Sequence, residues 1–164
     1  MRRNLLFLFL AGVLVSCRNA PDKSFFDRYD ITPINLSVEV AQAKAGNKLL
    51  LLEFGSSDSC EPCIRFEKQV FTQPEFMKYA DANLVFVRVD FPFNSDLSKS
   101  VNATNNLLSN TYQVEGFPSF IALDKGGKEF WRMPKKGDQD PPYEKLMEPQ
   151  AFISLLDSVK NSPR

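Results

Sequence analysis

Residues 49–70 read LLLLEFGSSDSCEPCIRFEKQV, and this stretch decides the fold. Positions 49–54 are apolar except for Glu53, as in a strand that is covered on both faces. Gly55 and a short polar cluster end the strand. Cys60-Glu61-Pro62-Cys63 then open a segment with the spacing of a helix. A buried strand, a short turn, a C-x-x-C motif and a helix, in this order, predict a redox-active pair of thiols.

The spacing of Cys60 and Cys63 suits thiol–disulfide exchange. At the start of a helix, the Cys60 sulfur faces backbone N–H groups without helical partners and the positive end of the helix dipole. Both favour the thiolate that attacks disulfides, and motifs of this kind lower a thiol pKa from about 8.5 to about 3.5–7.5. Cys63 lies about one turn further along and is close enough to form a ring with Cys60. Pro62 falls in the first turn, where its missing N–H costs little.

Three other uses of these cysteines compete with a redox pair. A zinc site needs about four Cys or His ligands, and the chain has three Cys and no His. A disulfide with only a structural role stays open, although so short a loop restrains little chain entropy. Two unrelated free thiols would be unusual in an oxidising compartment. The pattern favours the redox pair, so we expect neither a metal nor an organic cofactor.

Composition narrows the class of protein. A length of 164 residues suits one domain, and a hydrophobic content of 43% with 15 Phe is enough for a buried core. Lys plus Arg and Asp plus Glu both number 20. Without a basic tract or a phosphate-binding loop, this balance does not indicate nucleic-acid binding. The absence of His excludes His-assisted nucleophiles and the usual haem ligand sets.

The N-terminus is predicted to be a targeting segment. Arg2 and Arg3 precede an apolar stretch at 5–15, which is too short for a membrane-spanning helix of about 20 residues and suits a signal peptide. The following Leu-Val-Ser-Cys at 14–17 resembles the lipobox of bacterial lipoproteins, which implies cleavage after residues 1–16 and lipidation of Cys17. A plain signal peptide with an incidental Cys is the alternative. Residues 17–33 are then a tether and the entry to the fold, before a domain at 34–164.

The rest of the chain alternates helical and strand patterns. Apolar residues at helical spacing predict helices, continuous or alternating apolar runs predict strands, and Gly-rich turns separate the last two strands. The predicted elements are a helix at 35–45, a strand at 48–54, the helix after the C-x-x-C motif, a further helix from Pro74, a strand at 84–90, a weak helix at 97–112, strands at 120–123 and 128–133 and a closing helix at 150–161.

Four segments match a known family in the same order. They are FGSSDSC at 54–60, VFTQPEF at 70–76, DFP at 90–92 and GFPS at 116–119. Together they resemble the thioredoxin fold, in the form found in thioredoxin-like proteins of the bacterial envelope. The resemblance covers most of the chain from residue 34 onward and implies an α/β domain with a central mixed β-sheet flanked by α-helices. Several ordered matches are more specific than C-x-x-C alone.

The resemblance implies a role for each site residue. Cys60 corresponds to the exposed attacking cysteine, and Cys63 to the more buried resolving cysteine. Phe117–Pro118 corresponds to a cis peptide bond that faces the disulfide and aligns a substrate chain. Glu53 lies near the position of a buried acid that accepts the proton of the resolving cysteine. The alternative, an acid at the rim of the site without a role, stays open because the turn after the strand is one residue longer here.

Two departures from the family pattern affect the chemistry. Ser59 stands where the family usually has an aromatic residue, and this removes a flat contact surface. Glu61 places a negative charge beside Cys60, which disfavours the thiolate. A less stabilised reduced form makes a pair more reducing, so we predict a reduction potential nearer the reductases than the strong oxidants, and below about −150 mV.

The sequence therefore predicts a membrane-tethered thiol:disulfide oxidoreductase of the bacterial cell envelope, facing the periplasm or the exterior. Its expected partners are thiols and disulfides of other proteins, a redox partner that resets the Cys60–Cys63 pair, and the membrane through a lipid anchor. We expect a monomer. The alternative is a thioredoxin-fold binding or assembly module whose disulfide is structural and does not cycle.

Overall fold

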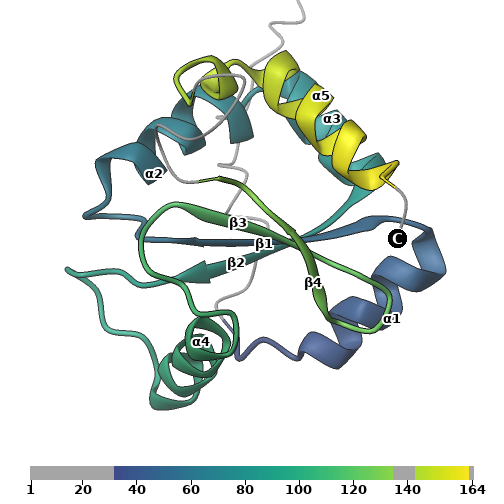
Figure 1. Cartoon of the computed structure of the whole chain (residues 1–164). Coiled ribbons are helices and arrows are strands. Elements are labelled where there is room, and N and C mark those ends of the chain that lie inside the picture. Colours follow the sequence, from purple (N-terminus) through teal and green to yellow (C-terminus); the bar gives the residue numbers. More distant parts are fainter. Residues whose placement is uncertain (1–31, 135–142, 163–164) are drawn as a thin grey trace, which may run out of the picture.

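The computed structural model describes residues 32–134 and 143–162. In Figure 1 a single sheet lies between two layers of helices, with α2, α3 and α5 on one face and α1 and α4 on the other. The elements in chain order are α1 (Leu36–Gly46), β1 (Leu49–Gly55), α2 (Glu61–Phe66), the π-helical turn η2 (Glu67–Phe71), α3 (Pro74–Asn83), β2 (Leu84–Asp90), α4 (Lys99–Thr111), β3 (Ser119–Leu123), β4 (Glu129–Arg132), the 3-10 turn η3 (Lys145–Met147) and α5 (Pro149–Lys160).

The sheet is mixed, as predicted. Its four described strands lie in the order β2-β1-β3-β4. β1 pairs in parallel with β2 and antiparallel with β3, and β3 pairs antiparallel with β4. The parallel pairing aligns the ends of β1 and β2, so the loops that follow both strands meet at one edge of the sheet. The C-x-x-C motif begins at this edge.

β1 is the centre of the core, because every residue in it is buried. Successive side chains of a strand point to opposite faces. Leu49 and Leu51 therefore pack under α3 and α5, while Leu50, Leu52 and Phe54 pack against α1 and α4. The alternation places Glu53 on the same face as Leu49 and Leu51, which is also the face that α2 covers.

Aromatic side chains fill the core beneath α2 and α5. Phe66 at the end of α2 packs against four other rings at centroid distances of 5.0–5.7 Å, those of Phe71, Phe120, Tyr143 and Phe152. These contacts join α2, η2, β3 and α5. Edge-to-face and offset ring pairs each add about 0.5–1.5 kcal/mol beyond burial. This cluster explains how a helix of only one and a half turns is held firmly on the sheet.

The predicted elements are confirmed, with ends within about two residues of the observed ones. The main difference is η2, where the helix after the C-x-x-C motif widens into a π-turn. A regular α-helix would turn Phe71 about 140° away from Phe66. The wider turn lets both rings face the core, where they stack at 5.7 Å.

Three predictions about the N-terminus lie outside the described residues, wholly or in large part. These are the signal peptide at 1–16 and the lipidation of Cys17, together with most of the tether at 17–33. Within the described ranges, no helix is both long and apolar enough to cross a membrane.

Candidate functional site

Cys60 and Cys63 form a disulfide at the start of α2, with their Cα atoms 5.2 Å apart. Cys60 is the N-cap residue, and its sulfur accepts a hydrogen bond from the Cys63 N–H at 3.2 Å. The local sequence explains this geometry, because Pro62 needs no hydrogen bond in the first turn. Cys63 is only 2% exposed, whereas Cys60 is partly exposed. A partly accessible cysteine and a buried one are therefore joined in the disulfide.

The Glu53 carboxylate lies on the β1 side of the buried Cys63 sulfur, next to Gly55. A Cβ atom added at Gly55 would lie 2.4 Å from Glu53 Oε1 and 3.2 Å from Cys63 Sγ. The carboxylate and the sulfur therefore converge on the space above Gly55, and a side chain at this position would have to displace the Glu53 carboxylate. Glu53 is 1% exposed. The structure thus puts this acid under the disulfide and not at the rim of the site.

The environment of Glu53 favours its protonated form. Burial raises the pKa of Glu53 to about 7, and the nearby charge of Arg88 opposes this shift while Asp90 and Glu67 add to it. Arg88 is the β2 partner of Glu53 in the strand register, and its Nε lies 3.5 Å from Glu53 Oε2. No hydrogen bond to Glu53 Oε2 is found within the described part of the chain. A carboxyl group that titrates near neutral pH suits proton transfer.

Arg88 and Glu67 belong to the site, although the sequence analysis did not identify them. Arg88 Nη1 donates to Glu67 Oε2 at 3.4 Å, so the guanidinium joins β1, β2 and the start of η2. The sequence does contain a feature that could have identified Arg88 as the partner of Glu53. Two apolar strands, at 49–54 and 84–90, each contain one charge in their interior, and the charges are opposite. Buried charges are seldom tolerated without a partner.

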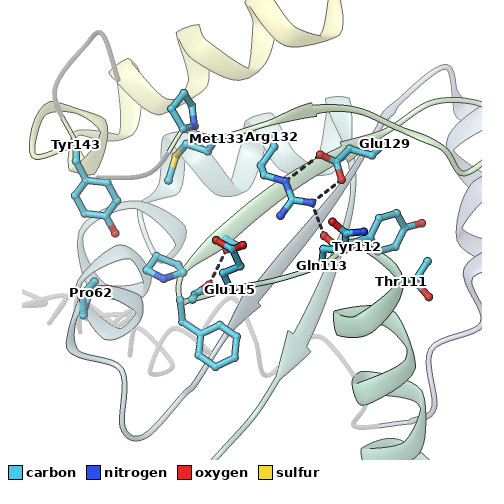
Figure 2. A pocket seen from close by; sticks show the side chains of 14 residues that line it. Pro62, Thr111, Tyr112, Gln113, Glu115, Glu129, Arg132, Met133 and Tyr143 are labelled. Atoms are coloured by element: carbon cyan, nitrogen blue, oxygen red, sulfur yellow. Dashed lines mark hydrogen bonds and ion pairs between the residues drawn. The ribbon is translucent and has the colours of Figure 1, made fainter. Parts of the chain in front are cut away.

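The peptide bond between Phe117 and Pro118 is cis, as the resemblance implies. Both residues line a groove of about 860 Å³ that also includes Pro62 of the C-x-x-C motif. Figure 2 shows the groove extending from Pro62 and Tyr143 past Met133 to Arg132. The structure therefore brings the predicted substrate-aligning residues to the same groove as the C-x-x-C helix.

Two carboxylates fix the loops around the disulfide. Asp90, at the end of β2, accepts hydrogen bonds from the Ser57 N–H at 2.8 Å and the Ser57 hydroxyl at 2.7 Å. Asp58 accepts from the N–H groups of Phe93 and Asn94, both at 2.7 Å. These backbone hydrogen bonds lower the pKa of Asp58. The turn before Cys60 and the loop after β2 are thus held as one unit, which the sequence analysis did not predict.

Arg132 holds the other side of the groove. It forms a two-pronged ion pair with Glu129 and donates to the backbone carbonyl of Tyr112 at the end of α4. The Tyr112 hydroxyl donates to the Gly127 carbonyl at 2.9 Å. These contacts connect α4 to the β3–β4 hairpin and so restrain the segment that leads to Pro118. Among the described residues, no cluster of three or more Cys, Asp or Glu side chains could hold a metal ion.

Residues 36–149 match the family model described as a thioredoxin-like domain. The chain belongs to the thioredoxin-like family. The matched range includes the disulfide, Glu53, Arg88 and the cis peptide bond, so all parts of the site lie within the family domain. The family and the mixed α/β sheet predicted from the sequence are both confirmed.

Several proteins of similar sequence or structure are named for thiol–disulfide chemistry. The disulfide bond reductase DsbH of Chlamydia pneumoniae is 34% identical over 91 residues, which are 56% of this chain and 55% of DsbH. The thioredoxin-related protein DsbJ of the same organism is 26% identical over 98 residues, which are 60% of this chain and 28% of DsbJ. The chain thus spans about half or less of these relatives. A solved structure titled DsbH oxidoreductase has a TM-score of 0.65 and 25% identity, covering 82% of this chain and 88% of that one.

Proposed function

We propose that this protein is a thiol:disulfide oxidoreductase that reduces or exchanges disulfides in other proteins through Cys60 and Cys63. One observation supports this above the others. The partly exposed Cys60 and the buried Cys63 form a disulfide, and the buried carboxyl group of Glu53 approaches the same space as the Cys63 sulfur. A structural crosslink needs no such acid, whereas a cycling pair must move a proton each time it opens or closes. The names of the relatives DsbH and DsbJ agree with this function.

The reaction begins from the reduced chain. The Cys60 thiolate attacks one sulfur of a substrate disulfide, so that a Cys60–substrate bond forms and the other substrate sulfur leaves as a thiolate that takes up a proton. The Cys63 thiolate then attacks Cys60 Sγ. The Cys60–Cys63 disulfide forms and the second substrate thiolate leaves. Two electrons pass to the substrate, and a dithiol partner returns two electrons and two protons to the chain.

Glu53 accepts the proton of Cys63 in this scheme. Its carboxylate and the Cys63 sulfur face the same space above Gly55, and a pKa of about 7 lets the group both take and return a proton near neutral pH. Arg88 is a positioning residue, because it holds the carboxylate from β2 and limits the rise in its pKa. The substrate chain lies in the groove beside Pro118, which Pro62 of the C-x-x-C motif also lines.

Trapping of mixed disulfides tests the proposal. The Cys63→Ser variant of the full chain, once reduced, should form a stable mixed disulfide with a protein substrate, because no second thiol is left to release Cys60. The Cys60→Ser variant is the matched control and should trap far less, since the remaining Cys63 is buried. If neither variant traps a substrate, or if both trap equally, the disulfide is structural and the binding-module alternative takes its place.

The tether and the location belong to the same proposal. Residues 1–16 would direct export and Cys17 would carry the lipid, so the domain from residue 34 would face the periplasm or the exterior of a bacterial cell. An acyl chain adds about 0.8 kcal/mol of membrane binding per buried CH₂. The Cys17→Ser variant should therefore move the protein from the membrane fraction to the soluble fraction. Retention of that variant in the membrane would contradict lipidation.

A further inference from the structure

Two loops beside the disulfide expose phenylalanines that the core does not use. Phe93 is 83% exposed and Phe117 is 40% exposed. Phe117 stacks on Phe91, with the ring centroids 5.3 Å apart and the planes 20° from parallel. Phe93 follows two residues after Phe91 in the same loop. We call these three residues the aromatic surface. Exposed apolar patches of this kind mark interaction sites.

Hydrogen bonds hold the backbone of Phe91 and Phe93 next to the segment that leads into Cys60. The Phe91 N–H donates to the Gly55 carbonyl at 2.9 Å, and the Phe93 N–H donates to the Asp58 carboxylate at 2.7 Å. Gly55 is the last residue of β1, and Asp58 lies in the turn between β1 and Cys60. An exposed Phe ring adds nothing to the core, yet its backbone is tied to the segment that carries the reactive sulfur.

The aromatic surface continues into the groove beside the disulfide, since Phe117 lines that groove with Pro62 and Pro118. The loops that carry it contain acidic charges alone. The groove is also lined by Arg132, whose charge Glu129 balances in an ion pair. The segments 56–62, 90–97 and 113–118 contain acidic residues and no Lys or Arg. These acids are Asp58, Glu61, Asp90, Asp96 and Glu115. A partner at this position meets aromatic rings within a negative field, which attracts cations over about 10 Å.

We propose that the aromatic surface binds an apolar side chain, adjacent to a lysine or arginine, in the cysteine-bearing segment of a protein substrate. The rings bury the apolar side chain, and the surrounding acids attract the basic one. This inference rests on the proposed function and adds to it a substrate class. Phe93 is its most specific residue, because the core does not account for its position.

Reduction of synthetic peptide disulfides tests the inference. Three peptides of equal length contain one internal disulfide and differ only beside a cysteine, where they carry Phe-Lys, Ser-Lys or Phe-Glu. The measured quantity is the second-order rate constant with the pre-reduced full chain in single turnover. We expect the Phe-Lys peptide to react about 5-fold faster than either of the others, which is the effect of one aromatic contact or one favourable charge pair.

Two variants test whether the aromatic surface is the source of the peptide preference. Phe93→Ser should bring the ratio of the Phe-Lys to the Ser-Lys rate constant close to one. Leu107→Ser removes an apolar side chain that is 65% exposed on α4, outside the aromatic surface, and should keep the preference. Equal rates for the Phe-Lys and Ser-Lys peptides in the unsubstituted chain, or an unchanged preference in Phe93→Ser, would overturn the inference. Equal rate constants for the Phe-Lys and Phe-Glu peptides would overturn the part of the inference that requires a neighbouring lysine or arginine.

A second substrate distinguishes failure of the proposed function from failure of the aromatic-surface inference. The small molecule bis(2-hydroxyethyl) disulfide reacts with an exposed thiolate without needing the aromatic surface. If the reduced chain reacts with it but shows no preference among the peptides, the oxidoreductase function stands and only the aromatic surface is rejected. If the chain reduces neither the peptides nor the small disulfide, the proposed function fails, and the inference fails with it.

Discussion

At the scale of single residues, the site depends on one acid in an apolar strand. Glu53 stood out in the sequence because a carboxyl group within such a run is costly unless it is protonated, paired or wet. The structure combines two of these, since Arg88 lies 3.5 Å away and burial raises the pKa to about 7. Its partner could not be predicted with the same ease, because pairing across strands depends on a register that only the folded sheet defines.

The Glu53 carboxyl group should make stability depend on pH. Its pKa rises from 4.5 to about 7 on folding, so between these values the folded chain keeps a proton that the unfolded chain has lost. This contribution is fully present below about pH 4.5 and is lost as pH rises to about 7, by roughly 3 kcal/mol. Urea unfolding of the oxidised full chain should therefore show a fall over this range that Glu53→Gln removes.

An exposed glutamate provides the control for that experiment. Glu75 lies in the first turn of α3 and is exposed. Glu75→Gln should keep the pH dependence of the unsubstituted chain. If Glu53→Gln kept it as well, the carboxyl group under the disulfide would not titrate in this range, and its assignment as proton acceptor would lose its basis.

Gly55 should be intolerant of any side chain. An added Cβ would lie 2.4 Å from Glu53 Oε1, so Gly55→Ala must displace the carboxylate or the strand. We expect it to lower the free energy of unfolding by about 1–3 kcal/mol, as overpacking does. Gly116→Ala is the matched control, because nothing lies within 4 Å of its added Cβ. Equal unfolding midpoints in urea for the two variants would show that the space above Gly55 is not closely packed.

At the scale of elements, α2 depends on the aromatic cluster and not on its own length. The helix has 6 residues before it widens into η2, and isolated helices of this size are unstable in water. The sequence showed that a helix follows the C-x-x-C motif. It did not show the π-turn, because that change depends on where Phe66 and Phe71 meet the rings of β3 and α5.

Phe66→Ala should therefore lower the free energy of unfolding strongly. The ring is fully buried against four others, and truncation of such a residue costs about 3–5 kcal/mol. Phe93→Ala makes the same chemical change at an exposed position and should stay within about 0.5 kcal/mol. Urea unfolding of both variants measures the difference. A loss for Phe66→Ala as small as that for Phe93→Ala would contradict the role of the cluster in holding α2.

At the scale of the whole molecule, the sequence was sufficient for the fold and for the redox pair. Apolar runs and helical spacing located the strands and helices, and the ordered motifs identified the family. Besides the partner of Glu53 and the π-turn, it missed contacts between loops, such as the hydrogen bonds from Phe93 and Asn94 to Asp58. Such contacts join segments with no shared periodicity. They became visible only when the parallel pairing of β1 and β2 brought both loops to one edge.

The reduction potential of the Cys60–Cys63 pair in the full chain tests the central claim most directly. Equilibration in glutathione or dithiothreitol buffers, followed by alkylation of free thiols, measures it. We predict a reversible couple between about −150 and −280 mV, on the reducing side because Glu61 disfavours the Cys60 thiolate. A value above about −150 mV would contradict the reducing poise. A disulfide that stays oxidised well below about −300 mV would contradict the enzyme itself and identify a structural crosslink.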